Sequence, residues 1–165
     1  NYLNFKTNSN KSFFLDNSKF ISIKIFLFLI FLQIILGAFV SGLDAGRIYQ
    51  TWPLMNESYY PNDVNFKDYK EFLNLNDRSV VQFIHRNVAY IIFFLLIFIG
   101  FNIKKFNKKN LYKPYFYLSI FVFIQIILGI LALITDLHIA VASLHQISSI
   151  FLILLSLNFY YKSIN

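Results

Sequence analysis

The sequence contains no cysteine among its 165 residues. Disulfides, thiolate metal sites and thiol catalysis are therefore excluded, and any redox chemistry must use a bound cofactor. Charge is also scarce, since 14% of the residues are charged whereas 57% are hydrophobic and 20% are aromatic. A water-soluble fold of this composition would leave too much apolar surface exposed, so the composition indicates a membrane protein.

The net charge of +7 comes from lysines that stand in short clusters beside long apolar runs. A nucleic-acid-binding protein would instead gather its basic residues along one polar face. Lysines at the ends of apolar runs are typical of membrane topology signals. Nucleic acid is therefore not an expected partner, whereas the lipid membrane is.

Four apolar runs cover residues 20–42, 80–101, 114–135 and 139–161. Each is close to the roughly 20 residues that a helix needs to cross the hydrocarbon layer. Unpaired backbone groups are costly in lipid, so such runs form helices. The sequence predicts an all-α membrane protein, a four-transmembrane-helix bundle that occupies residues 20–161.

The lysine clusters also predict how this bundle is oriented. They precede the first run, separate the second from the third, and follow the fourth. By the positive-inside rule, the tail 1–19 and the end 162–165 face the inner side. The loop 43–79, which has six acidic residues against four basic ones, and the turn near 136–138 then face the outer side.

An internal repeat divides the chain into two similar parts. The segment 33–37 reads Gln-Ile-Ile-Leu-Gly and recurs at 125–129, and an aspartate follows each copy at the same spacing, Asp44 and Asp136. A helix with one histidine follows each copy. We therefore expect two repeated helical hairpins related by a pseudo-twofold axis along the membrane normal. At the outer helix ends, each aspartate is expected to cap the segment after it.

The two histidines of the repeat, His85 and His145, are the candidate metal ligands. Each lies five or six residues from the outer end of its run, or roughly 8 Å at the helical rise. Pseudo-symmetry would place them at equal depth on opposite sides of the axis, where two imidazoles can ligate one haem iron. The alternative is that each histidine only bonds a neighbouring helix, although ionisable residues inside membranes usually serve a function.

Three further polar side chains are candidate cofactor-binding residues. Arg86 would be costly facing lipid, so it either reaches the outer interface or pairs with an anion such as a haem propionate. Gln33 and Gln125 lie deeper than the histidines, where they either bridge helices or orient an imidazole. Gly37 and Gly129 create narrow faces where a backbone or a flat macrocycle can approach.

At this point the residues resemble a known family. The run 36–46, Leu-Gly-Ala-Phe-Val-Ser-Gly-Leu-Asp-Ala-Gly, and the run 49–55, Tyr-Gln-Thr-Trp-Pro-Leu-Met, are similar to the signature of the haem A synthase family, Cox15/CtaA. The segments 82–86, Gln-Phe-Ile-His-Arg, and 144–146, Leu-His-Gln, resemble its two later histidine motifs. The resemblance extends over nearly the whole chain beyond the tail.

The resemblance implies eight spans in two four-helix halves, of which this chain resembles the C-terminal half. That half would hold haem b between His85 and His145, and the N-terminal half would bind haem O and carry the glutamate of a Glu-x-x-His motif. The equivalent position here is Gln82, which cannot accept a proton as a carboxylate does, so no catalytic residue is expected in this segment. The tail 1–19 would link the halves, and the start at Asn1 rather than Met suggests a fragment.

The implied activity is an oxidoreductase that converts haem O to haem A for cytochrome oxidase assembly. The expected location is the bacterial inner membrane, with the mitochondrial inner membrane as the alternative. Expected partners are lipid, haem O in the other half, and a second copy or haem O synthase. Two other hypotheses remain open: a stand-alone b-type cytochrome that carries electrons, and a haem-free structural bundle whose histidines only bond between helices.

Overall fold

The computed structural model describes residues 21–65 and 68–164, so the tail predicted at 1–19 lies outside the described residues. Within these ranges the chain is helical, with a single bridge between Met55 and Ser58 as its strand-like pairing. Four helices are long and apolar enough to cross a membrane. The predicted fold class is therefore confirmed. The elements are α1 (Ile21–Gly42), η2 (Ala45–Arg47), α2 (Tyr69–Phe72), α3 (Arg78–Lys105), α4 (Lys109–Ile134) and α5 (Ile139–Ile164).

Three of the long helices continue beyond the apolar runs that predicted them, because polar residues stabilise their ends. Asp77 caps α3, and its carboxylate accepts hydrogen bonds from the backbone N–H of Ser79 and Val80 at 2.8 and 3.0 Å. Lys104 and Lys105 lie in the last turn of α3, where positive charge suits the helix dipole. Hydropathy marks only the stretch that lipid can cover, so it misses these polar turns.

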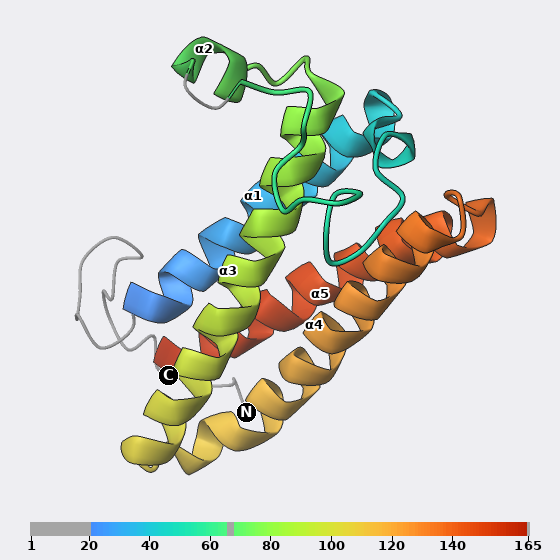
Figure 1. The fold of residues 1–165 in the computed structure, drawn as a ribbon. Helices are drawn as coiled ribbons and strands as arrows, with labels where there is room; N and C mark the ends of the chain where they lie inside the picture. Colours follow the sequence, from blue (N-terminus) through green and yellow to red (C-terminus); the bar gives the residue numbers. More distant parts are fainter. Residues whose placement is uncertain (1–20, 66–67, 165) are drawn as a thin grey trace, which may run out of the picture.

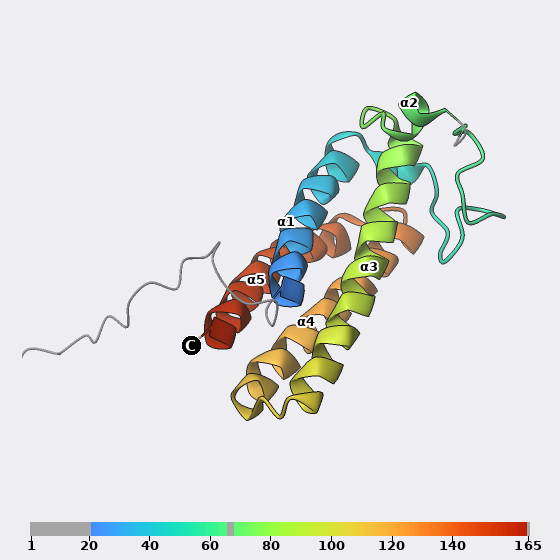
Figure 2. The ribbon, with the colours of Figure 1, turned by 90° about the vertical axis from the view of Figure 1, so that its left-hand side faces the viewer.

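The four long helices form a closed ring in the order α1, α3, α4, α5. The most extensive packing joins α1 to α3 and α4 to α5, and smaller contacts between α1 and α5 and between α3 and α4 complete the ring. Figures 1 and 2 show the two pairs and the short turn that joins α3 to α4 at one end of the bundle. Each hairpin of the sequence repeat is thus one packed pair.

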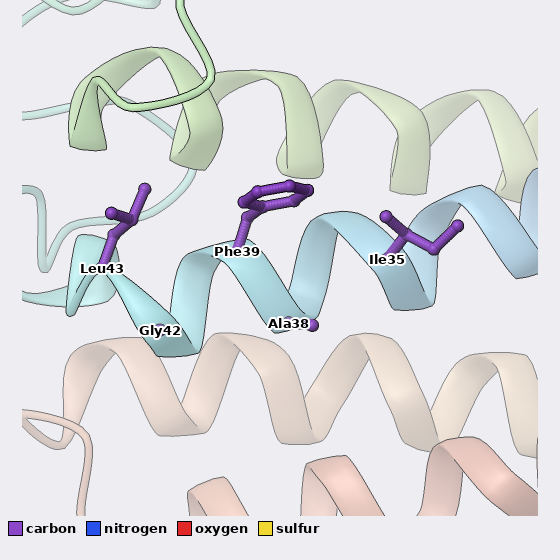
Figure 3. Close-up of a pocket in the computed structure, with 5 residues that line it drawn as sticks. All are labelled: Ile35, Ala38, Phe39, Gly42 and Leu43. Carbon is purple, nitrogen blue, oxygen red and sulfur yellow. The ribbon is translucent and has the colours of Figure 1, made fainter.

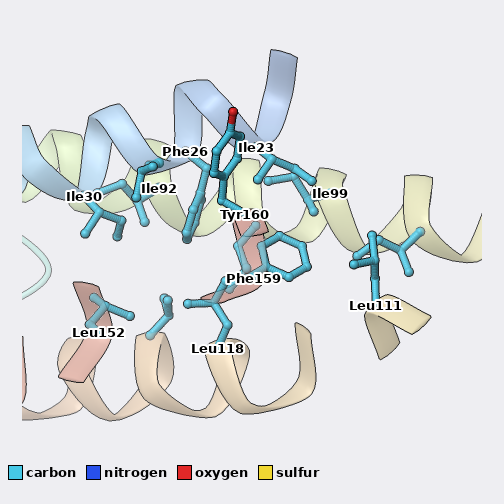
Figure 4. Close-up of a cluster of buried hydrophobic side chains, with 14 of the residues drawn as sticks. Ile23, Phe26, Ile30, Ile92, Ile99, Leu111, Leu118, Leu152, Phe159 and Tyr160 are labelled. Carbon is cyan, nitrogen blue, oxygen red and sulfur yellow. The ribbon is translucent and has the colours of Figure 1, made fainter. Parts of the chain in front are cut away.

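The hydrophobic core lies towards the inner end of this ring. Figure 4 shows Phe26 of α1, Ile99 of α3, Leu118 of α4 and Phe159 of α5 meeting in one cluster, and each of them is at most 1% exposed. In α5, the buried residues run from Leu152 to Ser163, and none lies in its first thirteen residues. The outer half of α5, which carries His145, is therefore less tightly packed than its inner half, whereas the outer end of α3 before His85 is buried from Ser79 to Phe83.

The aspartates that follow the repeat end their helices through the backbone. Asp44 has φ 51° and Asp136 has φ 54°, the left-handed conformation that aspartate adopts more readily than most residues. The Asp44 side chain makes no capping hydrogen bond to η2, so the capping role expected of it is wrong. The Asp136 carboxylate instead accepts a hydrogen bond from the Gln50 side chain of the outer loop. The repeat therefore preserves a turn geometry.

Candidate functional site

The first repeat builds a three-residue unit around His85. The Gln33 amide of α1 donates to the His85 backbone carbonyl of α3 at 3.1 Å, and it also lies 3.2 Å from Nε2 of the imidazole. Gly37 is one turn further along α1, and a Cβ atom there would lie 3.3 Å from the His85 Cε1 atom. The glutamine fixes the histidine backbone, and the glycine leaves room for its ring.

The second repeat builds the same unit around His145. The Gln125 amide of α4 donates to the His145 carbonyl of α5 at 3.3 Å and to the Ser148 hydroxyl at 2.7 Å. A Cβ atom at Gly129 would lie 3.2 Å from the His145 Cε1 atom. The four-residue spacing from glutamine to glycine therefore has one structural meaning in both hairpins: both residues contact the histidine of the paired helix.

Both imidazoles keep a buried nitrogen without a protein partner. The Nδ1 atoms of His85 and His145 are inaccessible to solvent and make no hydrogen bond within the described residues. An unpaired buried nitrogen is costly unless something else binds at the ring. His85 is the eighth residue of α3 and His145 the seventh of α5, so their depths in their helices differ by one residue, about 1.5 Å of rise. These features fit a pair of axial imidazoles.

A groove of about 410 Å³ runs along the outer half of α1. Figure 3 shows Ile35, Phe39 and Leu43 extending to one side of the helix, whereas Ala38 and Gly42 leave the other side bare. A Cβ atom at Gly42 would meet nothing within 4 Å. The small residues Ala38 and Gly42 therefore line an open stretch of the α1 surface.

Arg86 binds the outer loop in this structure. Its guanidinium donates to the Tyr49 carbonyl at 2.8 Å and to the Leu54 carbonyl at 3.3 Å, while its buried Nε atom has no partner in the described ranges. The Gln82 amide donates to the same Tyr49 carbonyl at 2.9 Å. Neither role considered from the sequence, propionate binding or contact with headgroups, describes this loop contact. Sequence patterns do not reveal it, because it joins residues 32 or more positions apart.

A second set of bonds holds the loop through its side chains. The Asp63 carboxylate accepts from the Tyr49 hydroxyl and from the Ser79 hydroxyl, each at 2.6 Å. Burial alone would raise the pKa of Asp63, but these two hydrogen bonds outweigh it and the pKa is lowered. Burial raises the pKa of Tyr49, and the bond to Asp63 raises it further. The loop is thus fastened to the beginning of α3.

Two contacts, besides the bond from Gln50 to Asp136, join the hairpins at their outer ends. The Gln146 amide, beside His145, donates to the Ser41 hydroxyl of α1 at 3.1 Å. Gly46 packs against Leu137, whose Cδ2 atom would lie only 2.9 Å from an added Cβ. Gln146 belongs to the Leu-His-Gln motif, from which no contact with α1 could be predicted. Its position directly after a candidate ligand is the signal that could have pointed to it.

Comparison with known proteins identifies the family of this chain. Residues 4–157 match the COX15-CtaA family, described as "Cytochrome oxidase assembly protein". The chain is 42% identical over 137 residues to the protein named "Heme A synthase" from Pelagibacter ubique (strain HTCC1062), covering 83% of this chain and 40% of that protein. The protein of the same name from Wolbachia pipientis wMel is 42% identical over 136 residues, which cover 82% of this chain and 37% of that protein. The one from Rickettsia africae (strain ESF-5) is 38% identical over 126 residues, which cover 75% of this chain and 36% of that protein. No solved structure matches the chain.

The chain therefore spans about two fifths of the length of the curated relatives that it matches. These relatives are bacterial, and the chain has four helices able to cross a membrane, so it is a bacterial multi-pass membrane protein. The family match covers nearly all of the sequence, including both glutamine, glycine and histidine units. The chain belongs to the COX15-CtaA family of cytochrome oxidase assembly proteins.

Proposed function

We propose that this chain is the haem b-binding half of a haem A synthase, which oxidises haem O to haem A. His85 and His145 would hold the haem iron, and Arg86, Gln33 and Gln125 would support them. The observation that carries the proposal is the repeated unit, in which a glutamine and a glycine hold a histidine with one unpaired buried nitrogen.

The number of ligands also supports a porphyrin. Among the described residues, no group of three or more histidines, cysteines, aspartates or glutamates could hold a metal ion. A haem iron takes four of its ligands from the porphyrin and needs only two from the protein. Two histidines on different helices, each beside a glycine, meet that requirement. When bound, the haem would supply reversible one-electron transfer.

The chain's own residues would position the haem and set its surroundings. Gln33 would restrain the His85 ring directly, and Gln125 would fix the His145 backbone. Arg86 would turn its unpaired Nε towards a propionate while its terminal nitrogens hold the loop. Gln82 replaces the glutamate of the resembled motif, so haem O oxidation is assigned to the other half. This supports electron transfer, rather than substrate oxidation, as the role of this segment.

The location and partners follow from the same proposal. The protein would lie in the bacterial inner membrane, with its lysine-rich turn on the inner side. Haem O would enter through the other half, and a second copy or haem O synthase would be the neighbouring protein. The stand-alone cytochrome and the haem-free bundle are not favoured, because the relatives of the chain are named as heme A synthases.

A reduced-minus-oxidised spectrum of the detergent-purified protein tests the proposal. We expect a low-spin b-type signal in the wild type that is lost or becomes high-spin in both His85→Ala and His145→Ala. His138→Ala is the matched control, because this third histidine is exposed in the turn between α4 and α5. The bis-histidine assignment fails if the two buried variants keep the wild-type spectrum or if His138→Ala changes it equally.

A further inference from the structure

A second groove lies at the opposite end of the bundle, between α3 and α4. Its volume is about 340 Å³, and its lining is largely aromatic and aliphatic with one lysine at its edge. The lining residues are Gly100, Ile103, Lys104, Tyr112, Tyr115 and Phe116. Nothing in the proposed haem site uses this groove. Its apolar lining suits part of a hydrocarbon chain.

The groove depends on the bare backbone of Gly100. The Tyr115 hydroxyl donates to the Leu96 carbonyl at 3.1 Å, which lays the ring across α3. A Cβ atom at Gly100 would lie 2.2 Å from that hydroxyl oxygen, so no other residue fits there without moving the ring. The Tyr115 ring also packs against Phe159 of the core, with centroids 6.2 Å apart. The floor of the groove is therefore part of the folded core.

The chain around the turn that joins α3 to α4, next to the groove, is strongly basic. Five lysines stand in the ten positions from 104 to 113, and all five are exposed. Helices α3 and α4 contain no aspartate or glutamate, so neither of them carries an acidic residue to neutralise these lysines. Basic clusters beside grooves between transmembrane helices suit anionic lipid head groups.

We propose that this groove, with Lys104 in its lining and Lys108 in the turn that joins α3 to α4, binds an anionic phospholipid. One acyl chain would lie along Ile103, Tyr112 and Phe116, and the phosphate would lie among the lysines. A positive-inside signal alone would require the charges but no apolar groove beside them. The combination of both features supports a lipid rather than a free anion. The proposal is independent of haem binding.

Native mass spectrometry of the detergent-purified protein, titrated with dioleoyl phosphatidylglycerol, tests the site. Lys104→Gln with Lys108→Gln should weaken binding about 25-fold, since each lysine near a head group contributes about fivefold. The matched control, Lys24→Gln with Lys162→Gln, removes two lysines at the ends of α1 and α5 and should change binding less than about twofold. Tyr112→Ala, which keeps the charge, should weaken binding several-fold.

Three results would overturn the lipid site. The first is equal weakening by both lysine pairs, which would reflect net charge alone. The second is equally tight binding of the zwitterionic dioleoyl phosphatidylcholine. The third is displacement of the lipid by inorganic phosphate, which would show an anion site without a hydrocarbon component. A wild-type helical circular dichroism spectrum in every variant confirms that the comparison is between folded proteins.

Discussion

The two hairpins use the same contact between glutamine, glycine and histidine but differ in what surrounds it. In the first hairpin, Gln33 reaches both the carbonyl and the ring of His85. In the second hairpin, Gln125 reaches the carbonyl of His145 and then a serine hydroxyl. The repeat thus fixes the position of each histidine backbone, whereas only the first histidine has its ring held by the glutamine.

Replacing the glycine beside each histidine should have the largest effect on haem binding. Gly37→Val and Gly129→Val would each place methyl groups against an imidazole that a single Cβ atom already approaches to 3.3 or 3.2 Å. We expect both variants to weaken haem binding by at least about fivefold, corresponding to overpacking of about 1–3 kcal/mol. The measurement is the haem-to-protein ratio after purification.

The control for the glycine variants is Gly42→Val, at a position with open space around its Cα atom on the same helix. It should retain haem as the wild type does. Equal loss in all three variants would show that α1 and α4 tolerate no valine, and would remove the argument for ring contact.

Replacing the two glutamines tests the difference between the hairpins, and the expected effect is smaller. Gln33→Leu and Gln125→Leu each remove one interhelical bond to a carbonyl, worth about 0.6 kcal/mol within a membrane. Only Gln33→Leu also frees an imidazole ring, so we expect it to shift the haem midpoint potential while Gln125→Leu leaves the potential nearly unchanged. Potentiometric titration with thermal unfolding measures both effects. Equal potential shifts would contradict the asymmetry.

The outer loop belongs to the first hairpin, and its hydrogen bonds should make the stability of the protein depend on pH. This is the smallest effect expected here. Because the pKa of Asp63 is lowered, its contribution to stability is present above the ordinary value of 3.8 and is lost as pH falls below that value. Because the pKa of Tyr49 is raised, its contribution is present below 10.0 and is lost as pH rises above that value. Between these limits the loop should stay fastened.

Asp63→Asn removes one of the two acceptors and should cost about 1 kcal/mol between those limits. The measurement is the unfolding midpoint of this variant and the wild type as a function of pH. The difference should disappear below 3.8. Asp44→Asn is the control, because the Asp44 side chain makes no capping hydrogen bond; a pH-independent deficit in Asp63→Asn would refute the proposed titration.

Much of this fold could be predicted from the sequence because lipid permits few structures. The apolar runs identified all four helices, and the repeat identified which residues are equivalent. The sequence did not reveal that Arg86 and Gln82 meet at the Tyr49 carbonyl, since a contact across a long loop leaves no periodic signal. It also misassigned Asp44, because a cap and a left-handed turn favour the same residue type.

The two hairpins have connections of unequal length, and this difference changes the entropy cost of bringing their helices together. Four residues, 135–138, join α4 to α5, whereas 35 residues, 43–77, join α1 to α3. By loop-closure entropy, bringing the ends of the longer connection together costs about 2 kcal/mol more. The bonds from Arg86 and Gln82 to Tyr49 hold the chain only seven residues beyond the end of α1 against α3. Once formed, they divide one long closure into shorter ones and keep the first hairpin together without a tight turn.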